Sequence, residues 1–389
     1  MTEIRPLTAL RGIAALLVFL YHYAVLFPPA ARGVAAGPEW VPFLAVWKQG
    51  QVGVSIFFVL SGFLITRIYW EAFARRRVSL RLFLVKRVAR IWPLFLAFAA
   101  VEHGARLGRG ETPDATWLVT GTMTQGFFAG LRYGGLPTAW SLTVEESFYA
   151  LAPVFFLVIA ALAWRDRRWD ARLDLRRVAA LVGALGLLVV AMAGLGAGVA
   201  AVAARTPLGW QGFMHPDDHW LHATLSGRLP EFALGMAAAF IHRDPRFTPW
   251  LTARRGLWLA LACFVAMGVA MAAKNDASSV GTLLLTYAIA LLAAVLILAL
   301  CAPDNVVVRL LSTRAAVHAG RISYGLYLVQ LTVMMTPLLA LTDRLGYARL
   351  PALYLLTSAF CALCYAVIEV PARRAVVARW GGHPAGKDR

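Results

Sequence analysis

An arginine and a histidine lie in the first long apolar stretch of the chain, residues 7–27. Arg11 and His22 are eleven residues apart, so on an α-helix they share one face at a separation of roughly 16 Å. Ionisable side chains are costly in hydrocarbon, so two of them in one membrane segment indicate a function. The ordinary pKa of imidazole, about 6.5, allows His22 to accept a proton. The alternative is a neutral histidine that makes one hydrogen bond between helices.

A basic cluster lies at the start of the apolar stretch 88–104. It consists of Lys86, Arg87 and Arg90, and the spacing of the two arginines places them on one helix face. Paired guanidinium groups can hold phosphate oxygens in bidentate hydrogen bonds. The alternative is that the cluster only anchors the helix at the membrane surface.

Two glutamates follow Trp140 near the start of another apolar stretch. A carboxylate of Glu145 or Glu146, at the level of His22, can orient the imidazole ring and stabilise its protonated form. The alternative is that both acids are favourable charges in the first turn of a helix.

An arginine and a carboxylate recur around Pro230. Arg228 and Glu231 are three residues apart, and we expect their charges to neutralise one another.

Three histidines, His215, His219 and His222, form a cluster of metal-like composition with two intervening aspartates. Because Pro216 disrupts a simple helical spacing, no metal site is predicted.

Membrane helices must position these residues. The chain is 60% hydrophobic, has a mean hydropathy of +0.66 and carries 15% charged residues, which excludes a soluble domain of ordinary composition. A helix of about 20 apolar residues crosses a bilayer. The sequence therefore predicts an all-α, polytopic integral membrane protein with about ten transmembrane helices. The predicted spans are residues 7–27, 46–66, 88–104, 141–163, 178–204, 224–242, 256–273, 280–301, 322–341 and 351–370.

The distribution of lysine and arginine predicts the orientation. With the N-terminus in the cytoplasm, the inside segments hold 28 of the 38 lysines and arginines. This bias favours N- and C-termini that are both cytoplasmic. It also explains the net charge of +18 without a nucleic-acid partner, because the arginines form short clusters at helix ends.

The polar connections are too short for a separate soluble domain. We expect residues 1–375 to form a single transmembrane domain and residues 376–389 a short basic cytoplasmic tail. Within the longest connection, residues 103–139, the half-apolar patch from Trp117 to Phe128 predicts an interfacial or re-entrant helix.

Seven segments occur in the order that is typical of one known family. They are Leu10-Arg11-Gly12-Ile13-Ala14-Ala15-Leu16 with His22, Gly53 to Ile65, Lys86 to Pro93, Trp140 to Tyr149, Pro230-Glu231-Phe232 with Gly235-Met236, Ile322 to Leu328, and Ile368 to Pro371 with Arg373-Arg374. On these segments the chain resembles the membrane acyltransferase-3 family, which includes bacterial O-acetylases of lipopolysaccharide and other cell-surface glycans. The resemblance covers nearly the whole chain.

The resemblance implies an enzyme of the bacterial inner membrane that moves an acyl group, usually acetyl from cytoplasmic acetyl-CoA, to a hydroxyl of a glycan or a lipid-linked sugar. Arg11 and His22 match the arginine and histidine that members of the family need for activity. Arg87 and Arg90 match its basic pair near the cytoplasmic face, and Glu145 matches the carboxylate of its Trp-Ser-Leu motif. Acetyl-CoA is then a donor substrate, and neither a metal nor a permanently bound cofactor is expected.

The chain departs from the family after the Ser-Tyr-x-Leu-Tyr-Leu stretch, where members often carry an aromatic residue and a histidine. Gln330 stands there in this chain. Glutamine cannot exchange a proton, so an acid-base role at this position is absent.

These features assign a role to each candidate residue. We expect His22 to act as the general base while Glu145 orients its ring. The expected catalytic residues are His22, Glu145 and Arg11. The expected acyl-CoA-binding residues are Arg11, Lys86, Arg87 and Arg90. The expected acceptor-binding residues are Trp140, Glu146, Arg228 and Glu231. The alternative function is a proton-coupled transporter or a flippase of a glycan or lipid-linked precursor, for which buried ionisable residues are equally expected.

Overall fold

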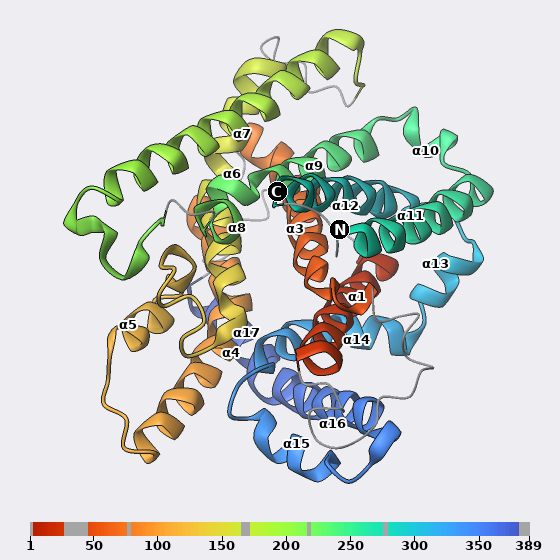
Figure 1. Cartoon of the computed structure of the whole chain (residues 1–389). Helices are drawn as coiled ribbons and strands as arrows, with labels where there is room; N and C mark the ends of the chain where they lie inside the picture. The colour runs from red at the N-terminus through yellow and green to blue at the C-terminus, as the bar shows by residue number, and fades with distance from the viewer. Residues whose placement is uncertain are drawn as a thin grey trace.

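The computed structural model describes residues 3–26, 46–75, 79–164, 172–215, 219–274 and 279–380. These residues form helices and connections without a β-strand, and one isolated bridge pairs Phe128 with Phe213. The α-helices of this part of the chain, labelled as in Figure 1, are α1 (Arg5–Leu20), α3 (Gly53–Ala74), α4 (Leu80–Gly108), α5 (Ala115–Gly121), α6 (Trp140–Ala163), α7 (Leu175–Ala203), α8 (His219–Ala223), α9 (Leu225–Arg243), α10 (Phe247–Trp250), α11 (Ala253–Ala273), α12 (Ser279–Ala299), α13 (Val306–Leu311), α14 (Arg314–Val329), α15 (Met335–Thr342), α16 (Arg349–Cys364) and α17 (Val370–Trp380). The shorter 3-10 segments are η4 (Gly50–Val52), η5 (Gln125–Phe127), η6 (Pro137–Ala139), η7 (Pro207–Gly212) and η9 (Gly346–Ala348), and the π-helical segments are η1 (Tyr21–Leu26) and η10 (Tyr365–Glu369).

Polar residues at the helix starts explain where several of these helices begin. A side-chain oxygen at the N-cap accepts a backbone N–H of the first turn, which otherwise has no partner. Such caps are Ser79 for α4, Asp114 for α5, Asp174 for α7, Thr252 for α11, Asn305 for α13 and Thr313 for α14.

Seven helical segments of the described chain are long and apolar enough to cross a membrane. They confirm the all-α, polytopic class and seven of the predicted spans. The segments are Arg5–Tyr23, Gly50–Phe73, Pro137–Ala163, Leu175–Ala203, Ala253–Ala273, Gly281–Ala299 and Arg349–Trp380. The predicted spans 88–104 and 224–242 lie within the continuous helices α4 and α9, which do not reach the same combination of length and hydropathy.

The prediction of one continuous span over residues 322–341 is wrong. Helix α14 ends at Val329, Gln330 is extended with φ −59° and ψ 140°, and Leu331 has a left-handed φ of 63°. Helix α15 begins only at Met335. Averaged hydropathy does not mark this break, because apolar residues continue on both sides of Gln330.

Two polar side chains from other helices stabilise the break. The backbone N–H of Val333 donates to Oε2 of Glu102 at 2.9 Å, and the N–H of Leu331 donates to the hydroxyl of Tyr23 at 3.4 Å. Backbone groups that leave a helix inside a membrane domain need such partners, since lipid offers none. Glu102 of α4 is buried, so its carboxylate is part of the structure of the α14–α15 connection.

Replacing Glu102 by leucine is expected to destabilise the fold by about 1–3 kcal/mol, because the buried N–H of Val333 then lacks an acceptor. Glu102→Gln keeps an acceptor oxygen and is expected to unfold near the wild-type temperature. The check is thermal unfolding of the detergent-purified variants. Equal unfolding temperatures for the leucine and glutamine variants would contradict this role.

Close helix contacts fix the position of α1 and α3 in the bundle. Helix α1 packs against α14 and α3, and α3 packs along α9 (Figure 1). A Cβ at Gly320 of α14 would lie 1.8 Å from the carbonyl oxygen of Thr8 in α1, and a Cβ at Gly62 of α3 would lie 2.2 Å from that of Phe232 in α9. Only glycine allows the backbones to approach this closely, as is common between membrane helices.

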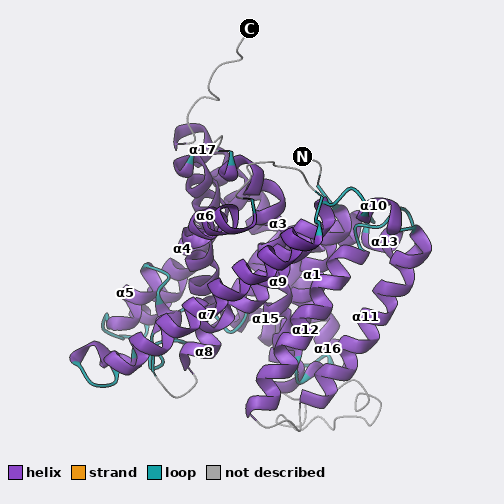
Figure 2. Ribbon diagram, turned by 90° about the horizontal axis from the view of Figure 1, so that it is seen from above, coloured by secondary structure: helices purple, strands orange, loops and turns teal. Residues whose placement is uncertain are grey.

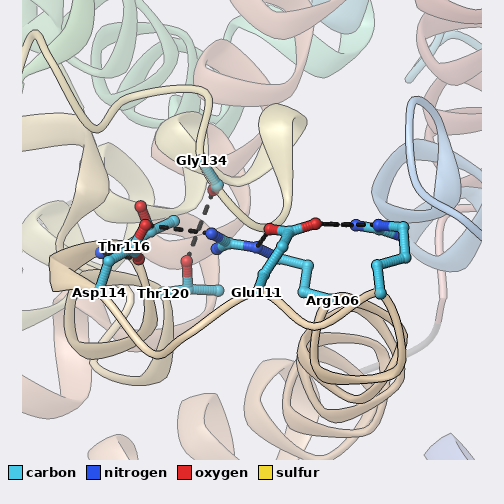
Figure 3. Close-up of polar contacts among 7 residues, drawn as sticks. Arg106, Glu111, Asp114, Thr116, Thr120 and Gly134 are labelled. Atoms are coloured by element: carbon cyan, nitrogen blue, oxygen red, sulfur yellow. Dashed lines mark hydrogen bonds and ion pairs between the residues drawn. The ribbon is translucent and has the colours of Figure 1, made fainter.

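The connection between α4 and α6 is held by a polar cluster, shown in Figure 3. Arg106 at the end of α4 donates to Glu111 at 2.6 Å and to Asp114 at 3.0 Å. The hydrogen bond from Arg106 lowers the pKa of Glu111 below its ordinary value. Thr120 of α5 donates to the carbonyl oxygen of Gly134 at 3.5 Å. The predicted helix at Trp117 to Phe128 is present as α5 and η5, and the cluster ties it to α4.

Helices α10, α13 and α17 lie on one side of the molecule (Figure 2), and α13 packs against α1. We call this the N-terminal side, because α1 begins there. Helix α17 continues to Trp380 and packs on α4, so the predicted boundary between residues 375 and 376 falls inside a helix. Residues 381–389 lie outside the described part of the chain.

Candidate active site

His22 lies where α1 passes into the π-helical segment η1, and its side chain is buried. Its Nδ1 is 2.6 Å from Oε1 of Gln330, the residue at which α14 breaks. Nε2 of Gln330 donates to the carbonyl oxygen of Leu326 at 2.9 Å, so Oε1 is the amide atom that faces the ring. Nδ1 of His22 must therefore carry the hydrogen, and Nε2 of a neutral imidazole has the free lone pair that a general base needs.

Glu145 of α6 has other partners than His22. Its Oε1 accepts a hydrogen bond from Oγ of Ser61 at 2.5 Å and another from the hydroxyl of Tyr149. The expectation that Glu145 orients the imidazole differs from what is observed, since the group bonded to His22 is Gln330. The break after α14 is the physical reason, because it turns the side chain of Gln330 toward His22.

Three arginines gather toward the N-terminal side. The charge of Arg90 lies within electrostatic range of Arg11 and Arg87. Cζ of Arg11 is 5.9 Å from the ring centroid of Phe57 in α3. Cζ of Arg87 lies 5.6 Å and 5.7 Å from the ring centroids of Tyr69 and Tyr149, respectively. Stacking of this kind holds a guanidinium while its N–H groups remain available to an anion.

Two carboxylates, Glu369 and Glu146, lie within electrostatic range of this cluster. Glu369 of η10 is buried and lies within electrostatic range of Arg90, Arg11 and Arg373. The arginines outnumber these two carboxylates, so the cluster keeps an excess of positive charge. The Nε atoms of Arg11 and Arg87 are buried and lack a hydrogen-bond partner within the described chain. An oxyanion with several oxygens, such as a phosphate, fits this set of donors.

Lys86 and Glu146 flank the arginine cluster in different ways. Lys86 is partly exposed and makes no hydrogen bond or ion pair with the residues that the structure describes. Oε2 of Glu146 accepts from Nε1 of Trp92 at 3.5 Å, and Glu146 lies within electrostatic range of Arg87. Glu146, an expected acceptor contact, is therefore on the side of the expected donor site.

The other expected acceptor contacts lie toward the opposite side. Nε of Arg228 is 2.7 Å from Oε2 of Glu231, and the side chain of Glu231 has no exposed surface. The ring of Trp140 lies under the guanidinium of Arg132, with 4.5 Å from the ring centroid to Cζ. Direct contact with a ligand is thus open to Arg228 and Trp140, while Glu231 holds the arginine in place.

The histidine cluster is not arranged around a metal in the described chain, where no group of three or more possible ligands converges. Nε2 of His219 is 3.0 Å from the carbonyl oxygen of Gly126. Burial and the nearby charge of Arg132 lower the pKa of His219 to about 4, so its ring is neutral at physiological pH. The two aspartates of the cluster lie outside the described residues.

Several residues of the site were missed by sequence reasoning. Ser61 and Tyr149 lie inside segments that carry the family resemblance, so their positions were marked but their contact with Glu145 was not. Gln330 was noted only for the chemistry that it lacks. Arg132 lies in a connection without periodicity, and nothing near it in the sequence indicates that it stacks on Trp140.

Comparison with known proteins decides the class of the molecule. The family profile described as an acyltransferase domain matches residues 5–369, which include His22, Gln330 and the arginines Arg11, Arg87 and Arg90. The chain belongs to this acyltransferase family. No solved structure matches the chain.

Three curated relatives of this acyltransferase cover much of its length. It is 28% identical over 365 residues to the acyltransferase MdmB of Streptomyces mycarofaciens. The aligned region spans 88% of this chain and 82% of the relative. It is 29% identical over 363 residues to nodulation protein 10 of Rhizobium leguminosarum bv. viciae, with 84% of each chain covered. It is 26% identical over 326 residues to the peptidoglycan O-acetyltransferase OatA of Listeria monocytogenes, with 76% of this chain but 47% of the relative covered.

Proposed function

We propose that this acyltransferase moves an acyl group, normally acetyl, from cytoplasmic acyl-CoA to a hydroxyl of a glycan or related cell-surface acceptor at the bacterial inner membrane. The observation that carries the proposal is the separation of two groups within one helix bundle. A cluster of arginines that can bind phosphate lies toward the N-terminal side, and a histidine whose Nε2 can accept a proton lies in η1, beyond the end of α1. The names of two relatives, an acyltransferase and a peptidoglycan O-acetyltransferase, support the reaction class.

In this proposal the N-terminal side is cytoplasmic and the arginines bind the donor. Arg11, Arg87 and Arg90 would hold the phosphate groups of acyl-CoA, because guanidinium groups form strong charge-assisted bonds to phosphate oxygens. Lys86 would add charge at the entrance. Glu145 would act through Tyr149, to which it is hydrogen-bonded and on which Arg87 stacks. Glu145 is then a positioning residue for the donor site.

The chemical step uses His22 as the base. Nε2 of His22 would take the proton of the acceptor hydroxyl while the hydroxyl oxygen attacks the thioester carbonyl. The bond between the carbonyl carbon and sulfur then breaks, and the imidazolium returns the proton to the departing thiolate of CoA. Gln330 would keep the productive tautomer in place during this cycle.

The test is acyl transfer in membranes. Inverted membrane vesicles that contain the protein are supplied with acetyl-CoA labelled in the acetyl group, and label is measured in the glycan fraction. Vesicles from the same cells without the protein are the control. Transfer of label that depends on the protein is expected. Equal label in both preparations would overturn the proposal, and glycan movement without label would support the transporter alternative.

Replacing Gln330 by leucine is expected to lower kcat by roughly tenfold to a hundredfold, the usual cost of losing the group that orients a functional histidine. The KM for acetyl-CoA should stay near its wild-type value, because the side chain of Gln330 bonds to His22 and to the carbonyl oxygen of Leu326 and not to the arginine cluster. Gln330→Glu is the matched control, since a carboxylate can accept the same hydrogen bond from Nδ1. If Gln330→Leu has the same kcat as Gln330→Glu, His22 does not need a hydrogen-bond acceptor at Nδ1 for catalysis.

A further inference from the structure

Arg132 is a partly buried arginine whose charge is not matched by a carboxylate among the described residues. It makes no ion pair or hydrogen bond with the residues that the structure describes, and its Nε is buried without a partner. Its Cζ lies 4.5 Å from the ring centroid of Trp140 and 4.9 Å from that of Tyr133. Aromatic contacts orient the guanidinium but do not use its N–H groups. The side chain is thus held in place with its hydrogen-bonding capacity free.

Two further cations lie near Arg132. Arg228 is within electrostatic range of Arg132, and the buried Lys274 is within range of Arg228. Glu231 is the carboxylate that pairs with Arg228, at 2.7 Å. In this cluster of described residues, three positive charges face one negative charge. We call Arg132, Arg228 and Lys274 the distal cations, because they lie away from the N-terminal side.

The distal cations border the histidine site. Tyr133, next to Arg132 in the chain, lies within electrostatic range of Tyr21, whose ring centroid is 5.3 Å from that of His22. Ser141, next to Trp140 in α6, is 2.7 Å from the hydroxyl of Tyr327, which lies on α14 shortly before Gln330, the partner of His22. Tyr327 also lies within electrostatic range of Arg132 and Arg228. A group bound by Arg132 is therefore close to the place where the acceptor hydroxyl must meet His22.

The backbone around Arg132 is fixed before any ligand binds. The N–H of Gly130 donates to the carbonyl oxygen of Gln211 at 3.0 Å, and the carbonyl oxygen of Gly134 accepts from Thr120 (Figure 3). Ordering a loop on binding costs free energy, so a loop that is already anchored favours recognition of a specific group.

We propose that Arg132, within the positive field of Arg228 and Lys274, binds an anionic group of the acceptor, so that the enzyme acts on acidic sugars. The group is a carboxylate or a phosphate carried close to the hydroxyl that is acylated. This proposal rests on the proposed function, since it assumes that the acceptor approaches His22. A neutral sugar would leave the excess positive charge of the distal cations uncompensated, which an anionic sugar offsets.

The test is binding of small sugars to the purified protein in nanodiscs. Saturation-transfer NMR is recorded with glucuronate, glucose 6-phosphate and glucose at equal concentration. The two charged sugars are expected to give signals at least about tenfold stronger than glucose, and the comparison between them distinguishes a carboxylate from a phosphate acceptor. Equal signals for the charged and neutral sugars, including the case in which neither binds, would overturn the proposal.

Variants assign the binding to Arg132. Arg132→Gln is expected to reduce the signals of the charged sugars at least about tenfold, whereas Arg109→Gln, which removes an exposed arginine paired with Glu111, should leave them unchanged. Arg228→Gln alone would leave the buried carboxylate of Glu231 without its ion-pair partner, so it is combined with Glu231→Gln. This double variant should weaken binding less than Arg132→Gln. Wild-type binding by Arg132→Gln would overturn the proposal.

Failure of this proposal and failure of the proposed function give different results. Were the protein not an acyl-CoA-dependent transferase, wild-type vesicles would not transfer labelled acetyl, yet the binding of acidic sugars would still depend on Arg132. Were the acceptor neutral, wild-type vesicles would transfer acetyl and Arg132→Gln would leave the KM for the acceptor unchanged.

Discussion

Replacing His22 by alanine is expected to lower the rate of acyl transfer about 10²–10⁴-fold, which is the contribution of a positioned general base. The loss should be in kcat, because the arginine cluster that is proposed to hold acetyl-CoA remains intact. His22→Gln should be similarly slow, since an amide can fill the space and bond to Gln330 but cannot take up a proton. The measurement is label transfer from acetyl-CoA in vesicles with equal amounts of each protein.

The matched control for His22 is His318, an exposed histidine on α14, the helix that ends just before Gln330. His318→Ala should retain wild-type activity. Should His22→Ala transfer acetyl as fast as His318→Ala, the proton would be taken by another group and the assignment of His22 as base would fail. Normal unfolding temperature of His22→Ala is needed for the comparison, because its ring is buried.

Helix periodicity was enough to place Arg11 and His22 on one segment, and the structure has both residues on α1 and its continuation η1. It was not enough to identify the partner of His22. The contact with Gln330 depends on the break after Val329, and the break depends on Glu102 and Tyr23 from distant parts of the chain. Tertiary partners of this kind leave no periodic pattern in a sequence.

The spacing of charged residues likewise predicted part of the arginine cluster but not all of it. The spacing of Arg87 and Arg90 put them on one face of α4, while the presence of Arg11 in the same cluster follows from packing between helices. The residue that was assigned to orient His22, Glu145, lies instead in a hydrogen-bonded group with Ser61 and Tyr149. The sequence motif predicted that Glu145 has a functional role. A motif does not, however, indicate which neighbouring residue a side chain contacts.

Two groups of cations therefore lie at different depths of one bundle, and they are expected to recognise different substrates. The charge of Arg11, Arg87 and Arg90 is partly offset by Glu369 and Glu146. The charge of the distal cations is partly offset by Glu231. Each retains an excess of positive charge, and His22 lies in η1, just beyond the end of α1. This arrangement allows an anionic donor and an anionic acceptor to approach the base from opposite directions without competing for one site.

Replacing Arg90 by glutamine is expected to raise the KM for acetyl-CoA about tenfold to a hundredfold, since a hydrogen bond between charged groups contributes roughly 1.5–3 kcal/mol. Arg90 lies within electrostatic range of both other arginines of the cluster, so its loss also weakens the field in which they act. kcat at saturating acetyl-CoA should change little, because the base is untouched. The measurement is the dependence of the initial rate on acetyl-CoA concentration.

The decisive comparison for Arg90 uses a donor that lacks one phosphate. With 3′-dephospho-acetyl-CoA the wild type should show a raised KM, and Arg90→Gln should add little to it if Arg90 binds that phosphate. If Arg90→Gln raises the KM for 3′-dephospho-acetyl-CoA by the same factor as the KM for acetyl-CoA, Arg90 binds the diphosphate instead. Arg81→Gln, which changes an exposed arginine near the start of the same helix, is the matched control and should leave KM unchanged. An Arg90→Gln variant with the wild-type KM for acetyl-CoA would mean that the cluster anchors α4 and does not bind the donor, because a phosphate held by that guanidinium cannot lose its charged partner without loss of affinity.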